Sequence, residues 1–316
     1  MKLVSTERVF PNLSTDVSRG RVVLEPAKAL WLLFMLVGSA IALLKYFSWS
    51  AVAVFILLSA ITLCAGHSVG MHRLLIHRSF QVPRWLERTL VYFGTLVGMA
   101  GPFGMIRAHD MRDWHQRQAK CPPHPSHGTG FLHDAWWQLC CSFRLDDPPD
   151  FAIEPTAAND KFYRFLERTW MAQQVPLALV LYAFGGTSWV LWGICVRISV
   201  SLIGHWAVGH MAHKRGQQTW AVQGLPVQGY NLPSLGLITF GESWHGNHHA
   251  FPHSARLGID SGQADIGYLL IIALKYFGLA HDIKQPDSEP HREGLYRLPK
   301  ASTRMPTGQS LSTKWI

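Results

Sequence analysis

Long stretches without a charged residue are the feature that most limits how this chain can fold. Residues 46–66 are uncharged over 21 positions, enough for a helix to cross a hydrocarbon core about 30 Å thick. Residues 29–44 are apolar over 16 positions, and Lys28 can extend this helix by placing its amine at the interface. Only 16% of the chain is charged, against about 25% in soluble domains. Since core helices of a soluble protein carry a polar stripe that these runs lack, we predict an all-α membrane protein.

Two further apolar runs complete the predicted architecture. Residues 172–196 are uncharged but interrupted by Gly-Gly-Thr-Ser, so we expect two helices joined by a tight turn. Residues 90–106 are also uncharged, and their glycines and proline favour a re-entrant or interfacial element. We therefore expect about four transmembrane helices and a cytoplasmic helical cap. The predicted parts are a cytoplasmic segment (1–28), a membrane domain (29–283) with spans at 29–45, 49–70, 173–185 and 188–208 and a cap at 71–172 and 209–283, and a polar, solvated or partly disordered tail (284–316).

The distribution of basic residues predicts the topology. The loop between the first two spans has Lys45 as its only charge, whereas many cations follow the second span. These are Arg73, Arg78, Arg84, Arg88, Arg107, Arg112, Arg117 and Lys120. The positive-inside tendency places this middle segment and both ends on the cytoplasmic side. We expect a bacterial inner membrane in preference to the endoplasmic reticulum.

A histidine cluster lies in the segment Gly-Glu-Ser-Trp-His-Gly-Asn-His-His. Offsets of three and four residues place His248 and His249 on the same helical face as His245. Neighbouring imidazoles repel one another when protonated but serve together as neutral metal ligands. Glu242, three residues earlier, can accept the second ring N–H of such a ligand. A ligand set rich in nitrogen suits iron, copper, nickel or zinc, in preference to magnesium or calcium.

Other histidines follow the predicted spans on the same side of the membrane. His72 and His77 are five residues apart, about 140° on an ideal α-helix, so they reach one site only if the helix loosens. His205 is at membrane depth near the end of the last span, where an ionisable residue is a functional candidate. His210 and His213 compete for that role, and we rank His213 second because it lies about 60–80° round the helix from His205.

These motifs resemble the integral-membrane fatty acid desaturases, most closely the acyl-CoA delta-9 (stearoyl-CoA) type. That family carries histidine motifs of the form HxxxxH, HxxHH and HxxHH, and one isolated histidine near the last span. The resemblance implies that His72 and His77 form the first motif, that His245, His248 and His249 form the third, and that His205 is the isolated ligand. It also implies two iron ions, O2 as co-substrate, an acyl-CoA or acyl-lipid substrate, and electrons from a ferredoxin or small cytochrome.

The second motif departs from this pattern. His109 matches its first histidine, but Arg112 and Asp113 occupy the two later histidine positions. Asp113 lies four residues after His109, on the same helical face, and a carboxylate can replace an imidazole as an iron ligand. Arg112 cannot bind a metal, and we expect it to pair with Asp110 or Asp113. Weaker candidates, as ligands or as supports behind them, are Glu242, His115, His127 and His213.

The net charge of +9 has several possible sources. Positive-inside topology explains part of it, and acidic electron donors or substrate phosphates explain the rest. We expect Lys120 and Arg144 to contact one of these partners, and we expect no nucleic acid partner. Two alternative functions stay open: hydroxylation of an apolar lipid on the same scaffold, and metal binding or transport by a histidine-rich membrane protein.

Overall fold

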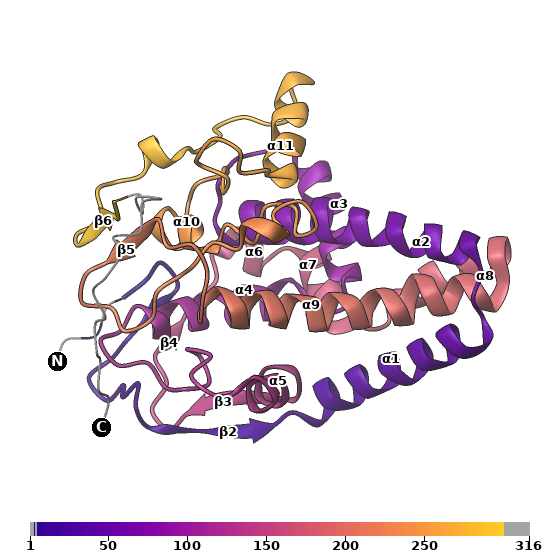
Figure 1. Ribbon diagram of the computed structural model, residues 1–316, viewed down its shortest axis with the longest axis horizontal. Helices are drawn as coiled ribbons and strands as arrows, with labels where there is room; N and C mark the ends of the chain where they lie inside the picture. Colours follow the sequence, from indigo (N-terminus) through magenta and orange to yellow (C-terminus); the bar gives the residue numbers. More distant parts are fainter. Residues whose placement is uncertain (1–2, 4, 300–316) are drawn as a thin grey trace, which may run out of the picture.

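The computed structural model describes residue 3 and residues 5–299. Long helices form one end of the molecule, and short helices, strands and loops form the other (Figure 1). Among the described residues, three helical stretches are long and apolar enough to cross a membrane. They are Pro26–Lys45 (α1), Trp49–Ile76 and Gln174–Ala212. The chain is thus predominantly helical, as predicted.

The third stretch folds back on itself. It consists of α8 (Gln174–Val190), the π-helix η2 (Leu191–Val196) and α9 (Arg197–Ala212). Gly186 has a φ of 63° and breaks the helical geometry of α8, and Leu181 packs in one cluster with Ile194 and Ile198. The chain therefore reverses at the glycine pair where the sequence predicted a turn, although the prediction of four crossings stays a prediction.

The second stretch changes its winding halfway. Ser48 accepts a hydrogen bond from the Ala51 N–H and caps α2 (Trp49–Ala60), which continues into the π-helix η1 (Ile61–Ile76). The His77 N–H donates to the His72 carbonyl, five residues back, at 3.0 Å. Because a π-helix bonds residue i to residue i+5, residues five apart come close to one face. This winding brings His72 and His77 together, which an ideal α-helix would not do.

The π-helix η1 packs against α3 (Arg84–Leu96) almost backbone to backbone. A Cβ atom added at Gly66 would lie 2.4 Å from the Gly94 nitrogen, and one at Gly70 would lie 2.6 Å from the Leu90 carbonyl carbon. Small residues four apart allow such close approach in membrane helices. The two glycines therefore fix the position of the helix that carries His72.

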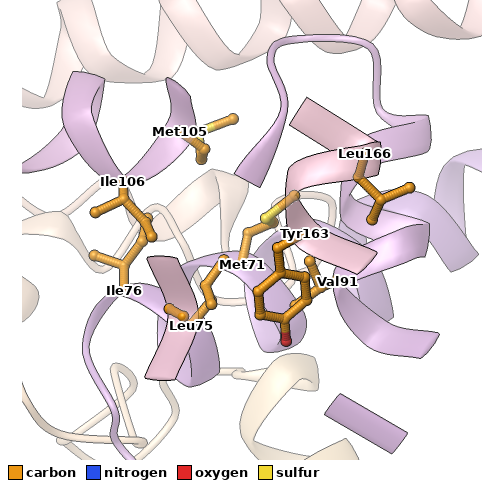
Figure 2. Close-up of a cluster of buried hydrophobic side chains, with 9 residues drawn as sticks. Met71, Leu75, Ile76, Val91, Met105, Ile106, Tyr163 and Leu166 are labelled. Carbon is orange, nitrogen blue, oxygen red and sulfur yellow. The ribbon is translucent and has the colours of Figure 1, made fainter. Parts of the chain in front are cut away.

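A buried apolar cluster joins the helix of the first histidine motif to that of the second. Its side chains come from η1, α3, α4 (Pro102–Gln116), α6 (Pro155–Ala158) and α7 (Lys161–Thr169) and converge between these helices (Figure 2). Asp160 caps α7 by accepting from the Phe162 and Tyr163 N–H groups. Ile106 and Ile76 are each at most 2% exposed, so α4 is held firmly against the end of η1. The cluster contains Met71, Leu75, Ile76, Val91, Met105, Ile106, Ala157, Tyr163 and Leu166.

The chain is not all-α, because three short antiparallel pairs join distant segments. They are β1 (Val9–Phe10) with β4 (Asp150–Phe151), β2 (Gly20–Leu24) with β3 (Cys141–Leu145), and β5 (Trp220–Val222) with β6 (Leu295–Arg297). Two of these pairs attach the N-terminal segment to the cap. The remaining helices are α5 (Phe131–Cys140), η3 (Pro233–Leu235), α10 (His245–Ala250), α11 (Ile266–Tyr276) and η4 (Pro286–Ser288).

The described part of the expected C-terminal tail packs on the domain. β6 pairs with β5, and an Arg292 Nη1 donates to the His249 carbonyl at 2.5 Å. Residues 284–299 are therefore attached to the rest of the protein by strand pairing and hydrogen bonds, while many of their side chains are exposed. The rest of that tail, residues 300–316, lies outside the described residues.

Candidate metal centre

The first histidine group combines three chain segments. His72 lies on η1, His77 ends it, His109 lies on α4 and His248 lies on α10, and their ligand atoms fall within 4.8 Å of one another. The Nε2 atoms of His77 and His109 are 3.2 Å apart. The His72 and His248 ring centroids are 4.6 Å apart. The structure thus brings together the whole first motif, one residue of the second and one of the third.

A second histidine group lies beside the first. It contains His213, which follows the last residue of α9, with His245 and His249 of α10. The Nε2 atom of His245 lies 3.0 Å from that of His213 and 3.0 Å from that of His249. The ring centroid of His248 is 5.9 Å from those of both His245 and His249. The two groups are therefore neighbours that share the short helix α10.

Buried amides hold α10 in place. Asn231 Nδ2 donates to Asn247 Oδ1 at 2.9 Å, and Asn247 Nδ2 donates to the Leu257 carbonyl at 2.8 Å. Asn247 is 1% exposed. A six-residue helix is too short to be stable alone, so these bonds are what fix the directions of its three histidines.

The nitrogen spacings fit metal ligation. A metal–nitrogen bond of about 2.1 Å places two ligands at right angles about 3.0 Å apart, and tetrahedral ligands about 3.4 Å apart. The spacings of 3.0 Å in the second group match the right-angled arrangement, and the spacing of 3.2 Å in the first lies midway between the two. Imidazole donors suit iron, copper, nickel and zinc, so each group could hold one of these metals.

The protonation of these histidines also suits ligation, which requires a free lone pair. Burial, together with the neighbouring imidazoles, holds the pKa values of His77, His245, His248 and His249 well below their usual range. Burial lowers the pKa of His213 to about 3. His109 is the exception, because Asp113 and Asp110 outweigh its burial and raise its pKa.

Glu242 supports the first group. Its Oε2 lies 2.6 Å from His72 Nδ1, and its Oε1 accepts from Ser68 Oγ at 2.6 Å. Burial would raise the pKa of this carboxyl, but His72 and Arg73 lower it well below its usual range. The partner is a histidine of the first motif, whereas we had expected a ligand of the third. A carboxylate behind a ligating imidazole fixes its tautomer and orientation.

Asp113 lies near both groups but belongs to neither by distance. Its Oδ2 is 3.3 Å from Arg117 Nη2, and its carboxyl lines one cavity with His77. Burial would raise the pKa of Asp113, but the charges of His109 and Arg117 hold it well below its usual range. Asp113 is therefore a carboxylate near histidines of both groups.

Arg112 does not make the ion pair that we expected. Its Nη2 donates to Gln138 Oε1 at 2.9 Å. The ion pairs of Asp110 and Asp113 go to Arg8, at 2.8 Å, and Arg117, at 3.3 Å. Arg112 therefore does not occupy the carboxylate of Asp113.

Of the predicted ligands and weaker candidates, His205 and His115 also lie outside both groups. His205 is exposed on α9 and stands against His67, with ring centroids 5.0 Å apart. His115 is 4% exposed and packs edge-on against Phe143, where burial lowers its pKa to about 4. His213 instead occupies the position that we assigned to His205, since the helix end, and not its middle, adjoins α10.

A third buried group was not foreseen. Asp134 joins His127 and His210, and all three are at most 8% exposed. From the sequence, His210 is only an alternative to His205 as the isolated ligand, and His127 is only a weaker candidate. His210 lies three residues before His213, a spacing that places both on one helical face. No sequence pattern connects His127 or His210 with Asp134.

Three of the cations named from the sequence, Arg73, Lys120 and Arg144, lie in different surroundings. Arg73 is 1% exposed and pairs with Glu242 and Asp265 inside the protein. Lys120 is exposed, just past the end of α4. Arg144 is exposed on β3 and bound to Glu25 at 2.6 Å. Of these three cations, Arg73 therefore serves the interior of the protein.

The fold and the two histidine groups define a histidine-rich helical protein with three helices long and apolar enough to cross a membrane and two groups that could hold a metal. Comparison with known sequences goes further: the profile of the fatty acid desaturase family matches residues 47–258. The chain is 37% identical over 244 residues to the sn-1 stearoyl-lipid 9-desaturase of Synechocystis sp., covering 77% of this chain and 74% of that protein. It is 35% identical over 243 residues to the sn-1 stearoyl-lipid 9-desaturase of Anabaena variabilis (77% and 87%).

A plant relative shows similar agreement: the acyl-CoA 5-desaturase of Anemone leveillei is 33% identical over 249 residues, covering 79% of this chain and 76% of that protein. The chain therefore belongs to the fatty acid desaturase family, and the predicted family, close to the delta-9 type, is confirmed. It is an oxidoreductase of lipid metabolism.

Proposed function

We propose that this protein introduces a cis double bond into a fatty acyl chain in an O2-dependent reaction at a pair of iron ions. The observation that carries the proposal is the pairing of two neighbouring histidine groups with nitrogen spacings of 3.0–3.2 Å. His72, His77, His109 and His248 would hold one iron, and His213, His245 and His249 the other. Asp113, which lies near both groups, is a further ligand in this proposal.

The iron pair would supply the oxidation of an unactivated C–H bond with O2, which side chains alone cannot perform. The protein's own residues provide the arrangement around it. Glu242 orients His72, the buried amides of Asn231 and Asn247 fix α10, and the apolar cluster behind α4 fixes His109. Placing one methylene pair accurately against the centre would then determine the position of the double bond.

The membrane arrangement in the proposal has four crossings: α1, the continuous helix Trp49–Ile76, and the two arms that meet at Gly186. The histidine groups would then lie at the cytoplasmic face of a bacterial inner membrane, as the positive-inside tendency predicts. This placement opens the site to acyl chains from the bilayer and to a soluble donor from the other side.

A cavity lies beside His77 of the first group. Its volume is about 330 Å³, and its lining includes His77, Asp113, Arg117 and His253. We propose that a ferredoxin or small cytochrome delivers electrons near this cavity. The exposed Lys120 would attract such an acidic partner, whereas Arg144 already has a partner in Glu25.

The substrate class in the proposal is a long fatty acyl chain. The cyanobacterial relatives are named for stearoyl groups on lipids and the Anemone relative for acyl-CoA. Cells that express the chain should contain a new monounsaturated fatty acid by gas chromatography, and cells expressing His248→Ala should not. Labelled stearoyl-CoA and labelled stearoyl lipid, each supplied to isolated membranes, separate the two carriers. A hydroxylated product, or no product with either carrier, would contradict the proposal.

A further inference from the structure

Asp134 is the centre of the third buried group. Its Oδ2 accepts hydrogen bonds at 2.8 Å from His127 Nδ1, from His210 Nδ1 and from Trp206 Nε1. Asp134 is 0% exposed. An indole nitrogen can only donate, and distances of 2.8 Å are typical of N–H groups bonded to a carboxylate. This oxygen therefore has no further capacity to accept hydrogen bonds. The third group is a network of hydrogen bonds to a carboxylate, whereas in the first two groups imidazole nitrogens face one another directly.

The network fixes the tautomer of His127. Because Nδ1 carries the proton given to Asp134, Nε2 keeps its lone pair. That Nε2 atom is buried and has no hydrogen-bond partner, and the whole side chain is 1% exposed. Leaving a buried polar atom unsatisfied is unfavourable, and an imidazole whose Nδ1 is held by a carboxylate is the usual arrangement of a metal ligand.

His127 lies directly beside the second histidine group. Its ring is nearly parallel to that of His213, at 14°, with centroids 5.4 Å apart. A Cβ atom on Gly209, one helical turn before His213, would lie 3.6 Å from His127 Nε2, an ordinary contact distance. His127 Nε2 therefore packs beside α9, one turn before the residue of α9's end that belongs to the second group.

Arg112 connects this network to the altered second motif. Arg112 stands where the motif calls for a histidine, and it donates to Gln138 Oε1 at 2.9 Å. Gln138 Nε2 in turn lies 3.4 Å from Asp134 Oδ1. The position that lacks an imidazole is thus joined, through one amide, to the carboxylate that presents another imidazole.

We propose that His127 is a fourth imidazole donor to the metal held by His213, His245 and His249, and that Asp134 is the residue that positions it. The inference rests on the proposed function, because it requires a metal at the second group. It explains how that group obtains a fourth nitrogen although Arg112 replaces a histidine of the motif. It also accounts for the buried, unpartnered Nε2 of His127.

The test uses the full-length protein, purified in detergent and loaded with iron, and measures how tightly each iron is held against a competing chelator. Wild type should bind two irons. His127→Ala should hold one of them about 10- to 100-fold more weakly, and Asp134→Asn should do so within the same range. Asp134→Glu should recover part of the affinity. His133→Ala, at an exposed histidine next to Asp134, should bind both irons like wild type.

A spectroscopic arm separates ligation from a purely structural role. In the cobalt(II)-substituted protein, His127→Gly should change the visible absorption spectrum, and free imidazole should restore it by filling the space beside Gly209. If His127→Ala does not fold, Asp134→Asn, which keeps the size of the side chain, carries the test.

Four results would overturn the inference. If His127→Ala holds both irons as tightly as wild type, the inference is wrong but the proposed function is not affected. The same holds if the cobalt spectrum of His127→Gly equals that of wild type. Wild type with three metals, one of them lost in Asp134→Asn, would assign a separate site to Asp134. Wild type that binds no iron would refute the proposed function and this inference together.

Discussion

Gly66→Ala should destabilise the protein and weaken its metal site, because the added methyl group has no room. Its Cβ would lie 2.4 Å from the Gly94 nitrogen and 2.4 Å from the Phe93 carbonyl carbon. Ordinary carbon contacts begin near 3.5 Å, so α3 must move away by about 1 Å. No side-chain rotation can relieve this clash, because the obstacles are backbone atoms.

Overpacking typically costs about 1–3 kcal/mol, and a backbone clash places Gly66→Ala at the upper end of that range. In a chain of this size about 3 kcal/mol corresponds to a fall in Tm of at least about 5 °C. The movement also reaches His72, six positions along the same helix, where ligands must be placed within about 0.5 Å. We therefore expect a weaker hold on iron at temperatures at which the variant is still folded.

The assay is thermal unfolding in detergent combined with iron content, and Gly204→Ala is the matched control. Gly204 is also a helical glycine in a membrane stretch, but a Cβ there would meet no atom within 4 Å. Since alanine is the better helix former by about 1 kcal/mol, Gly204→Ala should melt no lower than wild type. A Gly66→Ala protein that melts with this control and keeps its iron would refute the packing argument.

Four further predictions test the site and its surroundings. His213→Ala should lose one of the two irons, whereas His205→Ala should retain both; metal analysis giving the reverse result would restore our original assignment. Asp113→Asn should abolish product formation while the protein stays folded and membrane-inserted, and full turnover would remove Asp113 from the ligand set. Burial raises the pKa of Glu289 to about 7, so the folded state binds this proton more tightly than the unfolded state; the Tm of wild type relative to that of Glu289→Gln should fall between about pH 4.5 and 7 and then level off, and a Tm difference that does not change with pH would refute the assignment. Lys120→Glu should raise the donor concentration needed for the half-maximal rate, most clearly at low salt, and a rate indifferent to both charge and salt would exclude this surface as the docking site.

Motif spacing predicted much of the site, because an α-helical period brings His245, His248 and His249 close together in any context. For His72 and His77 the spacing argument required the helix to loosen, because residues five apart point in different directions on an α-helix. The π-helical winding of η1 meets that condition and brings the two side chains together. Such π-helical winding depends on packing, here against α3. The local sequence contains no periodic pattern that predicts it.

The ranking of His205 over His213 failed for a related reason. Depth in the membrane indicated function for His205, but which end of α9 approaches α10 depends on tertiary contacts such as the hydrogen bond from the Tyr230 N–H to the Ala212 carbonyl at 2.8 Å. Asp134 was missed because its partners are 7 and 76 residues away along the chain. The strand pairs that anchor the N-terminal segment are equally non-local.

Isotope labelling with ¹⁸O2 and mass spectrometry of the acyl product tests the central claim most directly. Purified, iron-loaded protein would receive a saturated acyl substrate, a reduced electron donor and labelled O2. The account predicts an acyl chain that has lost two hydrogens and carries no ¹⁸O, and it predicts no product from His248→Ala. An acyl chain that carries one ¹⁸O atom, or conversion that persists without iron or in His248→Ala, would contradict desaturation at the two histidine groups.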